Sequence, residues 1–129
     1  METNKTIAAL ALTLALGMNT SVYAQPDWVL VHTASGNGIK MEVQRSSLEF
    51  LQTRNGTTVV TALIRHENAT IGPQLNRYYV TVSDCKRKKG QIERVSINYR
   101  KKKYTHNFTF GDGFPTSIAA EFICTAANT

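Results

Sequence analysis

Two cysteines carry the most readily specified chemistry in this chain of 129 residues. Cys85 and Cys124 do not form a Cys-x-x-Cys motif, the spacing that is typical of redox-active pairs and zinc sites. In an oxidising compartment, the two cysteines of a small domain most often form one structural disulfide. The sequence therefore predicts a disulfide between Cys85 and Cys124.

A dense run of basic residues is the second feature with clear chemistry. Glu93 is the only acidic residue between positions 86 and 103, and the whole chain has a formal net charge of +6. Such a charge density favours polyanionic partners, namely sulfated glycans, lipopolysaccharide, anionic phospholipid or nucleic acid. Lysines in turns can also serve only to stay solvated and to keep sheet edges from pairing. The candidate binding residues are Lys86, Arg87, Lys88, Lys89, Arg94, Arg100, Lys101, Lys102 and Lys103.

Motifs of the common enzyme classes are missing from the sequence. His32, His66 and His106 are the only histidines, and none lies at metal-ligand spacing from another histidine or a cysteine. The chain has no Gly-x-Ser-x-Gly elbow, no phosphate-binding loop and no Gly-x-Gly-x-x-Gly sequence. We therefore expect a protein that is not an enzyme, has no catalytic residues, needs no cofactor or metal, and binds no specific nucleic acid.

The first 24 residues have the layout of a secretory signal peptide. Lys5 precedes an apolar stretch, residues 7–16, and Val22-Tyr23-Ala24 places small residues at the −3 and −1 positions of a cleavage site. The apolar stretch is too short to span a bilayer, which needs about 20 apolar residues. We expect residues 1–24 to be a bacterial signal peptide. Residues 25–129 are then a single domain in the periplasm, at the cell surface or secreted, without a transmembrane segment.

The elements that must position these residues are mostly strands. Residues 46–51 could form either a helical turn or an extended segment, and Asn55-Gly56 is a hairpin signal. Residues 67–75 form a polar stretch that predicts a loop. Apolar and β-branched patterns predict strands over residues 27–32, 39–43, 58–65, 78–84, 92–99 and 104–110.

A helix is expected at the C-terminal end. Thr116-Ser117 can cap a helix over residues 118–126, which contains Cys124. A disulfide to Cys85 would then attach this helix to the end of strand 78–84. The predicted fold class is α+β: an antiparallel β-meander of about five to six strands with a C-terminal helix and one disulfide.

The strand predicted over residues 92–99 separates the basic residues into two clusters, one at each of its ends. Arg94 and Arg100 lie on the strand face opposite Val95, where they could join the two clusters into a stripe. A stripe suits an extended polyanion or a flat acidic surface better than a small ligand.

Several segments, in this order, resemble the surface-adhesin protein E family of Gram-negative envelope proteins. The matching segments are Asp27-Trp28-Val29-Leu30-Val31, Ile39 to Val43, Ser46-Ser47-Leu48, Asp84-Cys85, and Ile118-Ala119 to Cys124. The resemblance implies an antiparallel sheet with a helix. It also implies a binding role, because the named member of the family binds host matrix proteins such as vitronectin and laminin.

Two functions follow as expectations. The first is an exported, non-enzymatic binding protein, adhesin-like, that contacts an acidic matrix protein or a polyanionic glycan through the basic residues. The alternative is a soluble periplasmic protein that acts as a structural or inhibitory partner of an envelope protein. Such a partner would use an apolar surface or an exposed strand edge.

Overall fold

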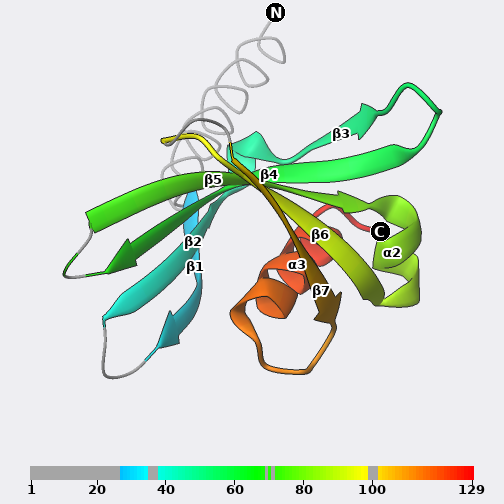
Figure 1. Cartoon of the computed structure of the whole chain (residues 1–129). Coiled ribbons are helices and arrows are strands. Elements are labelled where there is room, and N and C mark those ends of the chain that lie inside the picture. The colour runs from blue at the N-terminus through cyan, green and yellow to red at the C-terminus, as the bar shows by residue number, and fades with distance from the viewer. Residues whose placement is uncertain (1–26, 35–37, 69, 71, 99–101) are drawn as a thin grey trace, which may run out of the picture.

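The computed structural model describes residues 27–34, 38–68, 70, 72–98 and 102–129, so the expected signal peptide lies outside the described residues. Seven strands form one antiparallel sheet, and two α-helices lie against it (Figure 1). The strands are β1 (Trp28–Ala34), β2 (Ile39–Gln44), β3 (Glu49–Gln52), β4 (Thr58–Asn68), β5 (Gly72–Thr81), β6 (Lys89–Ser96) and β7 (Lys103–Thr109). The helices are α2 (Val82–Arg87) and α3 (Pro115–Ala126), with a 3₁₀ turn, η1 (Arg45–Ser47), between β2 and β3.

The sheet is a meander in the order β1-β2-β4-β5-β6-β7, and β3 also pairs with β4. Strands β2 and β3 share one edge of β4, since β2 pairs with residues 64–67 and β3 with residues 58–61. Between them, the Ser47 hydroxyl accepts the backbone N–H of Leu63 at 2.7 Å and donates to the carbonyl of Gln44. The segment 46–51 is therefore both a helical turn and a strand, because Ser47 satisfies a β4 donor that neither strand reaches.

The polar loop predicted over residues 67–75 is wrong. Strand β4 continues to Asn68 and β5 begins at Gly72, so most of this segment is paired strand. Pro73 lacks a backbone N–H, but it lies beyond the part of β5 that pairs with β6, which starts at Asn76. These ends of β4 and β5 can be polar because their side chains lie beyond the buried core.

Strand β6 begins and ends earlier than predicted. It runs from Lys89 to Ser96, and Ile97 lies in the following turn with 50% of its surface exposed. The side-chain Oδ1 of Asn98 accepts the backbone N–H of Leu75 at 2.7 Å, while the backbone N–H of Ile97 donates to the Leu75 carbonyl at 3.0 Å. An asparagine side chain thus takes the place of the next backbone pair and stops the strand.

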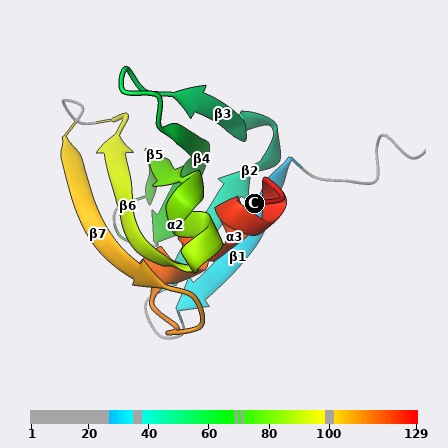
Figure 2. The ribbon, with the colours of Figure 1, turned by 90° about the vertical axis from the view of Figure 1, so that its right-hand side faces the viewer.

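The core lies between the sheet and α3, around which the sheet curves (Figure 2). We call the sheet face that packs on α3 the inner face. Helix α3 starts three residues earlier than predicted, because Pro115 suits the first helical position and Phe114 is the N-cap. The buried apolar side chains are Met41, Val43, Val60, Ala62, Ile64, Tyr78, Val80, Ile92, Phe108, Ala119, Ala120 and Ile123.

The disulfide between Cys85 and Cys124 is confirmed, with a Cα–Cα distance of 5.5 Å. Its predicted place at a strand end is wrong, because β5 ends at Thr81 and Cys85 lies on α2. The Thr81 hydroxyl accepts the backbone N–H of Asp84 at 3.1 Å and so caps this short helix. The bond therefore joins two helices, and both half-cystines are buried.

The antiparallel sheet, the C-terminal helix and the disulfide confirm the predicted fold class, with seven strands rather than five to six. Within the residues that the structure describes, neither helix has the length and apolar character that a membrane crossing requires. The disulfide indicates an oxidising environment.

Candidate functional site

Four consecutive cations, Lys86, Arg87, Lys88 and Lys89, lie on the last turn of α2 and at the start of β6, and all four are exposed. We call these four residues the basic turn. They follow directly on Cys85, which is only 2% exposed. The buried disulfide therefore holds the backbone from which these cations project into solvent.

Backbone hydrogen bonds fix the conformation of the basic turn. Lys88 is the C-cap of α2 in the left-handed conformation, with a φ of 62°, and its N–H donates to the Cys85 carbonyl at 3.2 Å. The Lys88 carbonyl accepts the backbone N–H of Phe110 at 3.0 Å. These bonds tie the turn to the segment that follows β7. The last turn of a helix is also the place where positive side chains interact favourably with the helix dipole.

Asp84 binds to residues on both sides of the basic turn's backbone bend, Arg87 and Gln91. Its carboxylate forms an ion pair with Arg87 and accepts the backbone N–H of Gln91 at 3.1 Å. Burial alone would raise the pKa of Asp84, but the hydrogen bonds from Arg87 and Gln91 outweigh it and hold this pKa below the ordinary value. A Cβ on Gly90 would overlap this carboxylate, so a glycine is required there. Asp84 thus neutralises one of the four cations and connects α2 to β6.

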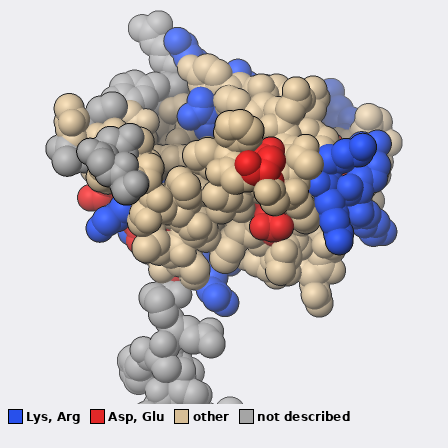
Figure 3. Space-filling model, turned by 90° about the horizontal axis from the view of Figure 1, so that it is seen from below, with Lys and Arg blue, Asp and Glu red and all other residues tan. Residues whose placement is uncertain are grey.

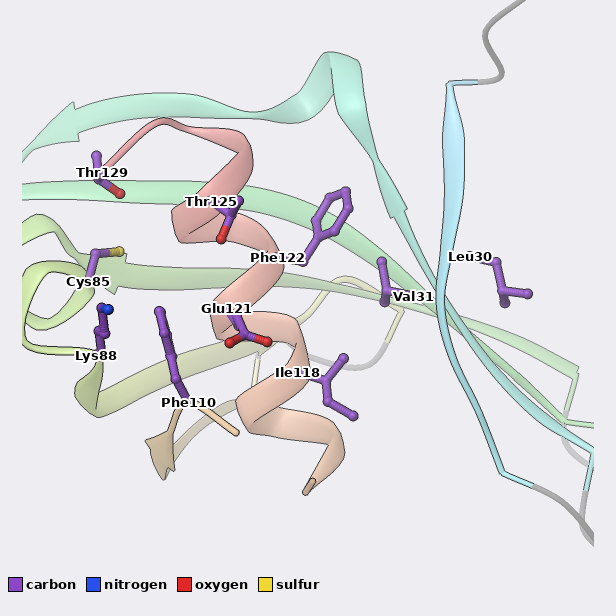
Figure 4. Close-up of a pocket in the computed structure, with 10 residues that line it drawn as sticks. All are labelled: Leu30, Val31, Cys85, Lys88, Phe110, Ile118, Glu121, Phe122, Thr125 and Thr129. Atoms are coloured by element: carbon purple, nitrogen blue, oxygen red, sulfur yellow. The ribbon is translucent and has the colours of Figure 1, made fainter. Parts of the chain in front are cut away.

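Basic side chains gather at the end of the molecule where α2 lies, with acidic side chains next to them (Figure 3). A shallow hollow of about 570 Å³ runs from this end over the outer side of α3. In Figure 4, Lys88 and Phe110 lie on one side of α3 and Val31 on the other, with Glu121 on the helix between them. Lys88 is the only basic residue among the described residues that line this hollow.

The remaining predicted binding residues that the structure describes do not join the basic turn. Lys102 and Lys103 are exposed at the other end of β6 and β7, where Lys103 forms an ion pair with Glu93 at 3.2 Å. The length of β6 separates the two groups by about 23 Å at about 3.3 Å per residue. Arg100 and Lys101 lie outside the described residues.

Arg94 lies on the face opposite Val95, as predicted, but this is the inner face that also carries buried Ile92. Its guanidinium stacks on the ring of Tyr104, with 4.5 Å between Cζ and the ring centroid. Arg94 therefore does not connect the two basic clusters across the outer surface. The seven described residues of the predicted nine separate into the basic turn, Lys102 and Lys103 at the far end of the hairpin, and the inner-face Arg94.

The histidines do not cluster with other candidate ligands. Among the residues that the structure describes, no group of three or more His, Cys, Asp or Glu side chains is placed to hold a metal ion. The imidazole Nε2 of His66 lies 2.8 Å from the Tyr78 hydroxyl on the inner face. Burial, helped by the positive charge of Arg94, lowers the pKa of His66 to about 4.

Sequence reasoning did not find the roles of Asp84 and Gly90. The signal was present in the sequence, because an acidic residue just before four cations and a glycine just after them suggest a turn with an internal counter-ion. Comparisons of this chain with family models, with curated proteins and with solved structures found no match.

Proposed function

We propose that this protein is an exported, non-enzymatic binding protein that holds a polyanionic partner, an acidic matrix protein or a glycan, on its basic turn. The observation that carries the proposal is the run of four exposed cations directly beside a buried disulfide. Only Arg87 among them has a carboxylate partner within the described residues, namely Asp84. Lys86, Lys88 and Lys89 therefore present positive charge that an acidic partner can neutralise.

A solvated charge run would not need this support. Here three features hold the backbone in one arrangement. They are the disulfide, the bonds that the Asp84 carboxylate makes with Arg87 and Gln91, and the left-handed conformation of Lys88. Rigid presentation reduces the entropy that binding costs, and like charges held close together attract a polyanion at long range. This combination supports a binding surface over a simple solubility feature.

Two features support export. The first 24 residues have the composition of a signal peptide, and the disulfide fits an oxidising compartment such as the periplasm or the exterior of the cell. An exported binding protein meets acidic glycans and matrix proteins directly, which is consistent with the proposed partner class.

The test is binding of purified residues 25–129 to immobilised heparin, vitronectin and laminin at low and at physiological salt. The variant combines Lys86→Gln, Lys88→Asn and Lys89→Gln; asparagine is chosen at position 88 because it tolerates the left-handed conformation. Three exposed charges at roughly 0.5 kcal/mol each predict a loss of about tenfold in affinity for the partner. Binding should also weaken as salt is raised.

The matched control removes the same charge elsewhere, with Lys40→Gln, Arg45→Gln and Arg54→Gln, all of which are exposed. Equal losses in both variants would reduce the effect to net charge and overturn the proposal. Absence of binding at physiological salt to all three probes would also overturn it.

A second candidate function rests on β3, which is exposed along its whole length. Phe50 is 54% exposed and Leu51 39%, and β3 pairs with β4 on one side. Its other side is suited to receive a strand of an envelope protein, as expected for a periplasmic structural or inhibitory partner. A pull-down that resists salt, survives the triple lysine variant and is lost on Leu51→Pro would favour this function.

A further inference from the structure

A polar hollow on the inner face of the sheet lies at the end of β6 that is remote from α2. Its volume is about 290 Å³. The described residues that line it are Gln74, Asn76, Arg94, Ser96, Lys102 and Tyr104. Two of these are cations and none is acidic, so the hollow has a positive charge and no internal counter-ion among its described lining residues.

Arg94 is the central group of the hollow. One face of its guanidinium covers the Tyr104 ring, and its Nε is buried without a hydrogen-bond acceptor among the described residues. No described carboxylate pairs with Arg94. An unsatisfied buried donor is costly. Stacking on a ring covers only the face of a guanidinium, so the in-plane donors of Arg94 other than the buried Nε are the ones that an oxyanion in the hollow would use.

The neighbouring titratable groups leave the charge of Arg94 uncompensated. Burial raises the pKa of Tyr78 to about 12, so its hydroxyl is neutral at physiological pH. His66, which hydrogen-bonds to that hydroxyl, is neutral as well because its pKa is about 4. Among the described lining residues, Arg94 and Lys102 therefore determine the charge of the hollow.

The other lining groups suit hydroxyl-rich ligands. Gln74 and Asn76 contribute amides, of which Asn76 is only 4% exposed, and Ser96 contributes a hydroxyl. The apolar surface of the described lining is the ring of Tyr104, which is 40% exposed. A peptide carboxyl terminus would need an apolar pocket for its last side chain, whereas a sugar needs amide and hydroxyl partners next to an aromatic ring.

We propose that this hollow binds the carboxylate of an acidic saccharide unit, a uronic acid, with Arg94 as the carboxylate-binding residue. Arginine pairs with a carboxylate through two parallel hydrogen bonds, which lysine does not reproduce. The hollow is separate from the basic turn, since Arg94 is five residue steps along β6 from Lys89, or about 17 Å. The inference therefore stands or falls independently of the function proposed for the basic turn.

The experiment is an NMR titration of ¹⁵N-labelled residues 25–129 with sodium glucuronate, following the Arg94 Nε–Hε signal. We expect this signal to shift in a saturable way with glucuronate and not with glucose, which lacks the carboxylate. Acetate should act much more weakly, because it has no hydroxyls for Gln74 and Asn76. An unmoved Arg94 signal at every glucuronate concentration overturns the proposal without any mutation.

Two variants distinguish the effect of the two parallel hydrogen bonds of Arg94 from the effect of its positive charge. Arg94→Lys keeps the charge and should weaken glucuronate binding by about tenfold or more. The control is Arg77→Lys, because Arg77 also has a buried nitrogen without an acceptor among the described residues but does not line the hollow. Equal losses in the two variants, equal binding of glucose, or tighter binding of a peptide with a free carboxyl terminus would each overturn the assignment.

Discussion

The imidazole Nε2 of His66 and the hydroxyl of Tyr78 lie 2.8 Å apart on the inner face, and both groups are largely shielded from water. This pair joins β4 to β5 beside the part of the core that α3 covers. Because burial favours the neutral form of histidine, the pair connects the stability of the fold to pH.

Stability should fall as the pH is lowered from 6.5 to 4. The pKa of His66 is about 4 in the folded state and 6.5 as the ordinary value, so the unfolded chain binds the additional proton in this window. Integration from pH 7 to pH 4.5 predicts a loss of about 2 kcal/mol in the free energy of unfolding. Urea denaturation at both pH values measures it.

The control for this prediction is His66→Gln, whose side chain can still bond to Tyr78 but does not titrate. Asp84 does not interfere, because its pKa is below 3.8 when folded and its contribution is lost only at lower pH. An equally large loss in His66→Gln would assign the pH dependence to other groups.

Removal of the disulfide should destabilise the protein strongly. Cys85 and Cys124 are 39 positions apart, and the chain-entropy model gives about 4 kcal/mol for a loop of this length. Cys85→Ser, Cys124→Ser and the double variant should therefore lose the same free energy of unfolding in urea. Additive losses in the double variant would show that each cysteine contributes through something other than their bond.

Replacement of Gly90 by alanine should cost about 2 kcal/mol of stability, from backbone strain and overlap with the Asp84 carboxylate. Gly56→Ala is the control, because Gly56 also has a positive φ but nothing within 4 Å of the added Cβ. Its loss should be smaller, about 1 kcal/mol. If the overlap matters, Asp84→Ala should reduce the additional cost of Gly90→Ala in a double-mutant cycle measured by denaturation.

Ser117→Ala should destabilise the start of α3. The buried Ser117 hydroxyl accepts the backbone N–H of Thr109 at 3.1 Å and donates to the Asp112 carboxylate at 2.9 Å. Alanine leaves the Thr109 donor without this partner, at a cost of about 2 kcal/mol in the free energy of unfolding. Ser46→Ala removes an exposed hydroxyl bond to Asp27 and should cost much less. Similar thermal midpoints for the two variants would contradict this account.

Local patterns in the sequence were sufficient to predict most strands, the C-terminal helix and the cysteine pair. Alternation over 39–43 and 58–65 needs no tertiary information, because side chains on a strand point to opposite faces in turn. The hairpin at Asn55-Gly56 is also predicted from local sequence, because these residue types favour a tight turn. The hydrogen bond from the Thr53 N–H to the Thr57 carbonyl, at 2.9 Å, closes it as predicted. Two cysteines leave one intramolecular pairing.

Tertiary structure decided the rest. Helix α2 is a short helix that the Thr81 cap and the disulfide hold, and neither is visible in the local pattern, so the sequence predicts residues 82–84 as the end of strand 78–84. The same alternation that placed Arg94 opposite Val95 could not say which face α3 covers, because that depends on contacts between elements far apart in the chain. The sequence by itself determined most of the elements and the charge. The packing of α3 and the length of β6 decided how the seven described basic residues are divided between an exposed turn, a distant hairpin end and the inner face.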